Sequence, residues 1–419
     1  MGLPRGWGLL LALGLTMSLV SAVPLPAAPV EIVRQPLRNG AFQLAGDVLL
    51  VLENDRTPTP VEAFDAGDGH SRWTYTPDGL TTLSYAAAAP GADDVVVLWP
   101  DLCRSGVTGT TVAVDRRTGR EVWHAPGVPV RTAAGVPGTV VLRSLWSDGC
   151  GALAANAPIG GGLRWQALGP GGEPRWELPV DAGTRVAVDS AEAGASWAAL
   201  ADRTGALAVA DFVTGRRAPA GDLVAASGDI VAAAGDLLII AAAGAGSPRG
   251  ATTLTAYRRG AWSAPLWRTD VPTVSASGRS DRFTVRACGA VLCATGQLTF
   301  VLDPATGAVR WSPGGYAQLA AAPGGLLTEP GAGVVHLFDP ATGAESPVLD
   351  GWQRLGADAD RMLLGAPDGE EATLLGFRAG DRVLPIGTVD ARLIACELDG
   401  PRVACSTGDG DVVLFRLAT

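Results

Sequence analysis

The chain of 419 residues lacks lysine altogether: all 32 of its basic residues are arginine, set against 42 acidic residues. The absence of lysine excludes two kinds of chemistry for this protein: catalysis through a lysine Schiff base, and phosphate binding by a loop that depends on a lysine. Charged residues make up only 18% of the chain, and the formal net charge is −10. Nucleic-acid binding requires a basic surface, so we expect no nucleic-acid partner.

Straight-chain helix formers are also scarce, whereas the chain contains 56 Gly and 30 Pro. Gly and Pro break helices, so this composition argues against a helical bundle. Disorder is equally disfavoured, because 47% of the residues are hydrophobic and 12 are Trp, enough to build a large core. The sequence therefore indicates a folded protein that is not a helical bundle.

The N-terminus has a single basic residue, Arg5, followed by an apolar stretch over 7–22. Small residues at Val20 and Ala22 are typical of a secretory signal that is cleaved after Ala22. The alternative is an uncleaved membrane anchor, since apolar residues continue to Val30, although an apolar core of about 16 residues is short for a membrane span. Both alternatives remain open at this point, and both place the rest of the chain outside the cytoplasm.

We accordingly divide the chain into a signal peptide or N-terminal anchor at 1–30 and a folded domain at 31–419. The folded domain is expected to be secreted, or to be held at the outside of the cytoplasmic membrane through the N-terminus.

The six Cys residues agree with export, because an even number in an exported chain suggests disulfides. Two pairs each span a turn between short apolar runs, and the remaining two Cys are left for each other. A zinc site is the alternative, but the chain has no CxxC motif and only three His. We expect three disulfides: Cys103–Cys150, Cys288–Cys293 and Cys396–Cys405.

The most informative feature is an internal repeat in which an Asp is followed four residues later by a Gly, after an apolar run typical of a strand. The clear copies are Asp65 and Gly69, Asp115 and Gly119, Asp211 and Gly215, Asp303 and Gly307, and Asp339 and Gly343. A Trp stands four residues after the Gly at Trp73, Trp123 and Trp311, and Trp176 keeps this spacing after a degenerate copy that ends at Gly172. Weaker copies lie at 257–260, 376–380 and 414–416, and the copies are 36 to 53 residues apart, the length of one supersecondary unit.

The residue types of the repeat predict a tight turn between two strands. An Asp side chain accepts hydrogen bonds from backbone N–H groups two or three residues on, and Gly supplies the positive φ that such a turn needs. The Trp opens the next strand, where its large apolar face can pack between neighbouring sheets. Each interval reads as four short antiparallel strands, which cannot bury both faces alone and must stack on copies of themselves. Radial stacking predicts an all-β fold, a β-propeller with four-stranded blades.

The number of blades depends on how the weak copies are interpreted. Literal counting gives nine signatures, but one or two weak copies can be misread, so we favour eight blades and do not exclude nine. The last copy ends at Phe415, which leaves too few residues for an outer strand. The segment Val30–Arg34 can supply that strand and close the ring. We expect a monomer.

The Asp-x-x-Thr-Gly-x-x-x-Trp motif resembles the pyrroloquinoline quinone-like β-propeller repeat family. The segments 115–123 and 303–311 match this motif throughout, and the resemblance covers roughly residues 40–416. The resemblance implies the fold but does not fix the function, because the family includes quinoprotein dehydrogenases, a lipoprotein that assists outer-membrane assembly, and sensor domains of membrane kinases.

The chain departs from the pattern of the quinoprotein dehydrogenases. The resemblance implies that those enzymes are longer chains with a disulfide between adjacent Cys residues, a calcium ion and an Asp base. In this chain no two Cys are adjacent. The Asp residues of the repeat already have a turn-capping role. His70, His124 and His336 lie within or beside the repeat signatures, and 409–411 reads as a hairpin turn rather than a calcium loop. We expect no catalytic, cofactor-binding or metal-binding residues.

Our first hypothesis is therefore a non-catalytic scaffold or assembly factor at the cell envelope, whose partner is another envelope or extracellular protein. Extra length at 100–110 and 145–162 marks these segments as recognition loops, which the Cys103–Cys150 bridge would join. The alternative is an extracytoplasmic sensor that binds a small ligand, sugar or peptide. A quinone-dependent dehydrogenase is the third possibility.

Overall fold

The computed structural model consists of strands and turns throughout the part of the chain that it describes. The described residues are 28–37, 40–53, 57–78, 83–89, 92–100, 109–130, 139–145, 163–188, 195–226, 229–242, 251–272, 283–296, 298–314, 318–328, 336–346, 351–358, 360–379 and 382–417.

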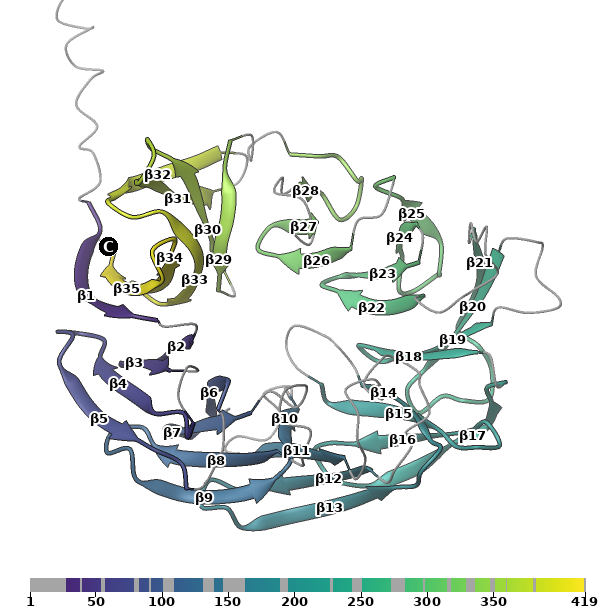
Figure 1. Cartoon of the computed structure of the whole chain (residues 1–419). Helices are drawn as coiled ribbons and strands as arrows, with labels where there is room; N and C mark the ends of the chain where they lie inside the picture. Colours follow the sequence, from purple (N-terminus) through teal and green to yellow (C-terminus); the bar gives the residue numbers. More distant parts are fainter. Residues whose placement is uncertain are drawn as a thin grey trace, which may run out of the picture.

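Nine antiparallel sheets are arranged around a common centre (Figure 1), and each sheet forms one blade. The first strands of neighbouring blades contact each other, for example β2 with β6 and β29 with β33. The all-β propeller expected from the sequence is confirmed. The blade number is nine, the alternative that literal counting of the signatures gave, rather than the eight that we favoured.

The strands follow the chain order within the blades. Blades 1 to 3 comprise β2 (Ala41–Ala45), β3 (Val48–Leu52), β4 (Val61–Asp65) and β5 (Ser71–Tyr75); β6 (Tyr85–Ala89), β7 (Ala92–Trp99), β8 (Thr110–Asp115) and β9 (Glu121–Pro126); and β10 (Val128–Val130), β11 (Val140–Leu145), β12 (Leu163–Leu168) and β13 (Pro174–Val180). Blades 4 to 6 comprise β14 (Arg185–Val188), β15 (Trp197–Ala201), β16 (Ala206–Asp211) and β17 (Arg217–Val224); β18 (Ile230–Ala234), β19 (Leu237–Ala242), β20 (Ala251–Arg258) and β21 (Trp267–Pro272); and β22 (Thr284–Cys288), β23 (Val291–Thr295), β24 (Thr299–Leu302) and β25 (Val309–Trp311). Blades 7 to 9 comprise β26 (Leu319–Ala322), β27 (Gly325–Thr328) and β28 (Leu337–Phe338); β29 (Gln353–Ala357), β30 (Met362–Pro367), β31 (Thr373–Ala379) and β32 (Arg382–Val389); and β33 (Leu393–Asp399), β34 (Arg402–Thr407), β35 (Asp411–Arg416) and β1 (Val30–Pro36).

The weak copies of the repeat are the reason why we favoured eight blades. The copies at 257–260, 376–380 and 414–416 lie in blades 5, 8 and 9, which pair their strands as the other blades do. Blade 7 is the reduced one: a single bridge between Phe338 and Glu345 replaces its fourth strand. Backbone pairing holds a blade together even where the Asp or the Trp of the signature is missing.

The N-terminal strand β1 closes the ring, as the sequence predicts. It is the outermost strand of blade 9 and pairs antiparallel with β35, from Val30 opposite Arg416 to Pro36 opposite Asp411. The backbone N–H of Leu37 extends this pairing by donating to the Gly410 carbonyl oxygen at 2.7 Å. Residues from the two ends of the described chain therefore share one sheet, and β1 leads from blade 9 directly into β2 of blade 1.

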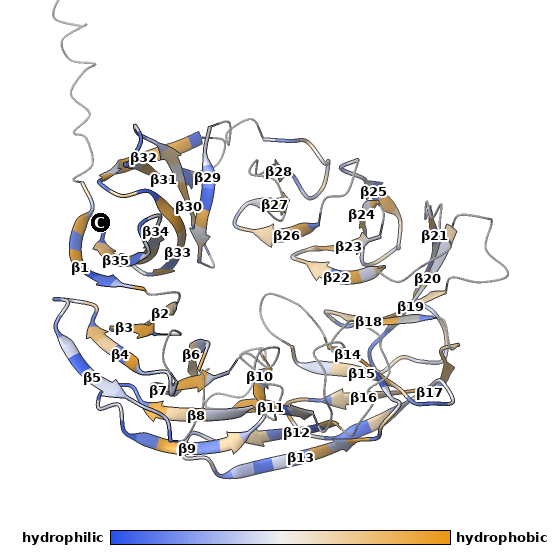
Figure 2. Ribbon diagram, in the orientation of Figure 1, coloured by the Kyte–Doolittle hydropathy of each residue, from blue (hydrophilic) through white to orange (hydrophobic). Residues whose placement is uncertain are grey.

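The core lies between neighbouring blades. The second strands are mostly apolar, and all residues of β3 and of β15 are buried. The fourth strands are more polar, as Figure 2 shows for β5 and β13. Two fully buried Trp side chains, Trp165 in blade 3 and Trp197 in blade 4, fill the space between sheets. Burial of such side chains stabilises the stack of blades through the hydrophobic effect.

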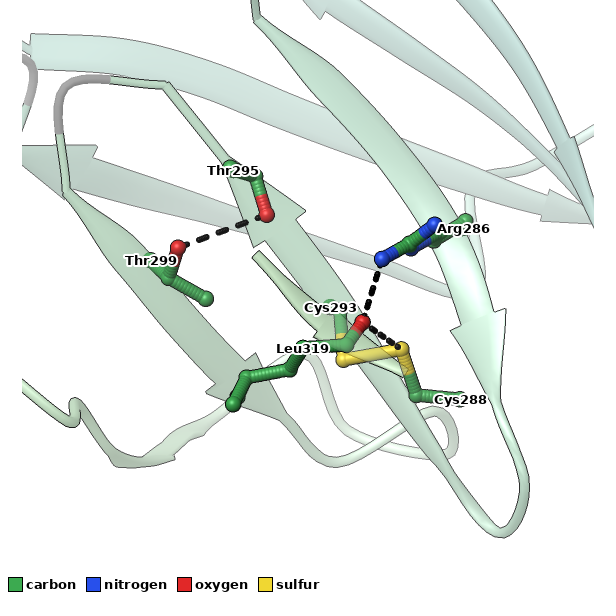
Figure 3. The surroundings of a disulfide bond; sticks show 6 residues. All are labelled: Arg286, Cys288, Cys293, Thr295, Thr299 and Leu319. Atoms are coloured by element: carbon green, nitrogen blue, oxygen red, sulfur yellow. Dashed lines mark hydrogen bonds between the residues drawn. A yellow bond between two sulfur atoms is a disulfide. The ribbon is translucent and has the colours of Figure 1, made fainter. Parts of the chain in front are cut away.

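Two of the three expected disulfides are present: Cys288–Cys293 joins β22 to β23, and Cys396–Cys405 joins β33 to β34. The third expected pair, Cys103–Cys150, lies outside the described residues. Figure 3 shows that Arg286 and Cys288, both on β22, approach the carbonyl oxygen of Leu319 in the next blade. Arg286 Nη2 donates to this oxygen at 2.5 Å, so the edge of blade 6 is tied to blade 7.

The two ends of the ring differ in how they connect strands. At one end, which we call the turn end, the first strand of each blade leads to the second and the third leads to the fourth. At the opposite end, the connection end, the second strand leads to the third and the fourth leads to the next blade. All five clear Asp and Gly signatures therefore lie at the turn end.

Candidate functional site

The signature Asp residues cap the tight turns at the turn end. In the turn after β8, Asp115 Oδ1 accepts hydrogen bonds from the backbone N–H groups of Arg117 and Thr118 at 3.1 and 2.7 Å and from the Thr118 hydroxyl at 2.7 Å. The same pattern of backbone donors occurs at Asp65, Asp211, Asp303 and Asp339. The φ angles of the five signature Gly residues lie between 68° and 79°. These carboxylates thus stabilise the turns that follow the third strands of the blades.

An Arg side chain adds to the capping at several signatures. Arg310 Nη2 donates to Asp303 Oδ2 at 2.6 Å, and Arg72 Nη2 donates to Asp65 Oδ2 at 2.6 Å. Mainly through the Arg310 hydrogen bond, the pKa of Asp303 falls to about 2. These Asp residues are held ionised at neutral pH, so they are poor proton acceptors.

The signature Trp residues join each blade to the next. The Trp73 ring lies against Gly119 of the following blade, and its Nε1–H donates to the Arg116 carbonyl oxygen at 2.8 Å. Equivalent ring contacts with a turn Gly are made by Trp123 with Gly172, Trp176 with Gly215, and Trp311 with Gly343. The indole N–H groups of Trp123 and Trp311 also donate to a carbonyl oxygen in that turn, whereas Trp176 Nε1 is buried without a hydrogen-bond partner.

Trp267 in blade 5 is a fifth member of this set, which the fixed spacing of the signature did not predict. Its ring packs against Gly307, and its Nε1–H donates to the Pro304 carbonyl oxygen at 2.8 Å. Trp267 stands seven residues after Gly260 rather than four, because the hairpin between β20 and β21 is longer and includes an Arg258–Ala261 bridge. A search that allowed the Gly-to-Trp spacing to vary would have found it.

The seam between blade 9 and blade 1 uses different residues. Here Ile32 and Val33 of the closing strand occupy the place of the Trp, against the signature residue Gly69. Deeper in the seam, Glu397 Oε2 on β33 accepts hydrogen bonds from Gln43 Nε2 at 2.9 Å and from the Leu44 backbone N–H at 2.6 Å. Burial raises the pKa of Glu397 to about 7 despite the Leu44 hydrogen bond. The closure of the ring therefore contains a carboxyl group that titrates near neutral pH.

At the connection end, blade 2 presents an aromatic pair. Tyr85 begins β6 and Trp99 ends β7, and their rings stack with centroids 5.8 Å apart. Tyr85 is 47% exposed, one of the largest exposed hydrophobic side chains. Trp99 stands directly before the recognition loop predicted at 100–110, and most of that loop, like the loop predicted at 145–162, lies outside the described residues. β7 and β11 run toward the connection end, so both predicted loops leave the ring there.

The connection end also has a cavity of about 200 Å³ between blades 8 and 9. It lies where the innermost strands β29 and β33 begin, and the apolar side chains of Leu355 and Leu393 are among its lining. The polar residues Gln353, Glu370 and Arg392 line it as well. No sequence pattern marks these residues as a site, because they come from three segments that only the fold brings together.

The remaining residues named from the sequence make local interactions. His124 and His336 are exposed and pair through Nδ1 with Glu121 and Glu345 respectively. Gly410 has a φ of 84° in the turn between β34 and β35, in agreement with a hairpin turn at 409–411.

Two further observations concern only the described part of the chain. It contains no group of three or more His, Cys, Asp or Glu side chains arranged to hold a metal ion. It also contains no helix with the length and hydrophobicity that crossing a membrane requires.

The similarity of this chain to known proteins is limited to the fold. No protein-family model matches the chain, and no curated protein matches it. Among solved structures, the chain is similar to BamB from Moraxella catarrhalis, with 14% identity, a TM-score of 0.42, and coverage of 93% of this chain and 98% of BamB. It is also similar to Sqt1 from Saccharomyces cerevisiae, with 10% identity, a TM-score of 0.47, and coverage of 94% and 98% of the two chains. A eukaryotic initiation factor has 10% identity and a TM-score of 0.50, with coverage of 83% and 87%, and at such identities the likeness concerns the fold alone.

Proposed function

We propose that this chain is a non-catalytic, exported β-propeller that binds another protein at the cell envelope through its connection end. The observation that carries the proposal is the stacked pair of Tyr85 and Trp99, of which Tyr85 is 47% exposed. Tyr and Trp are enriched at the centres of protein interfaces, because they bury a large area at little cost in side-chain entropy. The pair stands at the base of a predicted recognition loop.

The difference between the two ends of the ring supports this assignment. At the turn end, the signature Asp, Gly and Trp residues are engaged in capping turns and in joining blades. The connection end carries the longest segment between two strands of one blade, from Leu145 at the end of β11 to Leu163 at the start of β12, whereas β34 and β35 are joined there by a short turn. Variable loops on a rigid frame are the usual carriers of recognition.

Export is supported by the disulfides Cys288–Cys293 and Cys396–Cys405, because such bonds persist in oxidising compartments. The closing strand β1 also suggests how the ring would be oriented relative to a membrane. Val30 pairs with Arg416 at the turn end, so an N-terminal anchor would join the ring there. The connection end would then point away from the membrane, toward a partner. The resemblance of the repeat to the pyrroloquinoline quinone-like family remains part of this proposal, since non-catalytic members of that family act outside the cytoplasm.

The test is a comparison of the proteins that co-purify from the host with three forms of the full chain: wild type, Tyr85→Ser and Val309→Ser. Val309 on β25 is a matched control, since it is 42% exposed and lies on an outer strand far from the connection end of blade 2. We expect quantitative mass spectrometry to show a protein that the wild type and Val309→Ser retain and that Tyr85→Ser loses. Equal recovery with all three forms would overturn the proposal.

A second candidate function is an extracytoplasmic sensor of a small ligand. The cavity between blades 8 and 9 favours it, because a concave site with an apolar floor and a few polar groups is the usual form of a ligand pocket.

A further inference from the structure

The cavity at the connection end of blades 8 and 9 brings together groups of opposite charge. Glu370 lies in the turn between β30 and β31, and Arg392 lies just before β33, in the next blade. Gln353, at the start of β29, adds an amide. The apolar contribution comes from Leu355 and Leu393, which are 6% exposed each.

The polar side chains of this cavity fall into two groups. Thr373 is used by the fold: its hydroxyl donates to the Ala391 carbonyl oxygen at 2.8 Å and accepts from the Leu393 backbone N–H at 3.1 Å. The side chains of Gln353, Glu370 and Arg392, in contrast, are exposed and make no hydrogen bond or ion pair with any described residue. A carboxylate, a guanidinium and an amide thus remain available in one small cavity.

The volume limits what the cavity holds. An apolar cavity of about 150 Å³ is large enough for benzene, whereas pockets for drug-sized ligands span about 300–1,000 Å³. At about 200 Å³, this cavity fits a molecule only slightly larger than benzene.

We propose that this cavity binds a free α-amino acid with a small aliphatic side chain. Its carboxylate would pair with Arg392, its ammonium group with Glu370, and its side chain would rest on Leu355 and Leu393. A zwitterion offers a charged partner to both groups at once, whereas a ligand with a single charge can pair with only one of them. This inference rests on the second candidate function, the sensor, and is independent of the protein-binding proposal.

The test begins with thermal unfolding of the full chain in the presence of L-valine, L-leucine, valinamide, N-acetylvaline and maltose. A ligand that binds only the folded state raises the unfolding temperature. Titration calorimetry then gives the affinity for each compound that does so. We expect saturable binding of valine or leucine, and at least tenfold weaker binding of valinamide, which lacks the carboxylate, and of N-acetylvaline, which lacks the ammonium group.

Variants locate the site. We expect Glu370→Gln and Arg392→Gln each to weaken the binding of the amino acid at least tenfold, whereas the exposed controls Glu371→Gln and Arg382→Gln leave it within twofold. Binding of maltose that Arg392→Gln abolishes would overturn the amino-acid assignment but keep the sensor. Absence of binding by all five compounds, or amino-acid binding that neither Glu370→Gln nor Arg392→Gln weakens, would overturn the proposed site.

Discussion

The indole ring of Trp73 in blade 1 lies against Gly119 in blade 2, so closely that a Cβ atom on Gly119 would stand 2.6 Å from Trp73 Cδ2. A hydrogen bond reinforces this contact, because the Trp73 Nε1–H donates to the carbonyl oxygen of Arg116, in the turn that Gly119 completes. Both the positive φ of the turn and the approach of the ring require Gly at this position.

Gly119→Ala should destabilise the protein for two reasons. A φ of +68° costs an L-residue roughly 1–2 kcal/mol, and displacing the Trp73 ring from a packed seam adds about 1–3 kcal/mol. The matched control is Gly235→Ala, whose φ is +60° but whose added Cβ atom would meet nothing within 4 Å. Denaturant unfolding of both variants measures the difference. Equal destabilisation by the two substitutions would show that the Trp contact does not hold the blades together.

Glu397 should make the stability of the closed ring depend on pH. Its pKa in the folded protein is about 7, above its ordinary value of 4.5, because the carboxyl is buried between blades 9 and 1. The protonated form is therefore favoured by folding, so this contribution is fully present below pH 4.5 and is lost as the pH rises through 7.

Glu397→Gln keeps an oxygen that can accept the Leu44 N–H but removes the charge. From pH 5 to pH 8.5, the free energy of unfolding of the wild type should fall relative to that of the variant by roughly 2–3 kcal/mol. This is the size that the pKa shift of Glu397 implies. Urea unfolding across this range, with Glu371→Gln as an exposed control, is the measurement. A pH profile that Glu397→Gln leaves unchanged would refute the role of this carboxyl.

Asp303 should respond to the loss of its Arg partner. The Arg310 hydrogen bond is the largest reason why the pKa of Asp303 is about 2, and the N–H groups of Ala305 and Thr306 add to it. In Arg310→Gln, NMR titration of the carboxyl carbon should give a pKa that moves back toward 3.8. Because a lowered pKa stabilises the fold above 3.8 and this stability is lost as the pH falls through 2, the variant should also lose part of its stability at neutral pH. An unchanged titration curve would contradict the hydrogen bond between Arg310 and Asp303.

Much of this fold could be predicted from the sequence because its local chemistry repeats. Asp and Gly at a fixed spacing specify a turn through interactions within a few residues, and the alternation of apolar runs predicts the strands. Trp267 escaped the pattern because a longer hairpin shifted it by three residues. The blade number was less certain because the weak copies in blades 5, 8 and 9 lack the Asp or the Trp of the signature, although their strands pair as in the other blades.

The candidate sites could not be predicted in the same way. The Glu397 carboxyl meets the Leu44 backbone across a sequence separation of 353 residues, and its raised pKa depends on burial that only the closed ring creates. The cavity likewise combines Gln353, Glu370 and Arg392 from separate segments. No local pattern connects such residues, whereas the closing strand at Val30 was predictable because blade 9 lacked one strand.

The dehydrogenase alternative makes a spectroscopic prediction. The signature Asp carboxylates already accept backbone hydrogen bonds, as at Asp115 and Asp339, so we expect no set of them to hold calcium and quinone together. Pyrroloquinoline quinone added to the exported protein, with and without calcium, should leave the quinone absorption spectrum unchanged. A saturable, calcium-dependent spectral change would support an enzyme and oppose the scaffold.

The most direct test of the central proposal is site-specific photo-cross-linking in the host cell. A photoreactive residue is placed at Tyr85 on the connection end, at Gly235 on the turn end, or at Val309 on an outer strand, each in the full chain. The account predicts that one defined protein is cross-linked from position 85 and from neither of the other two. Cross-linking of the same protein from position 235 or 309 but not from 85, or no cross-linking from any position, would contradict it.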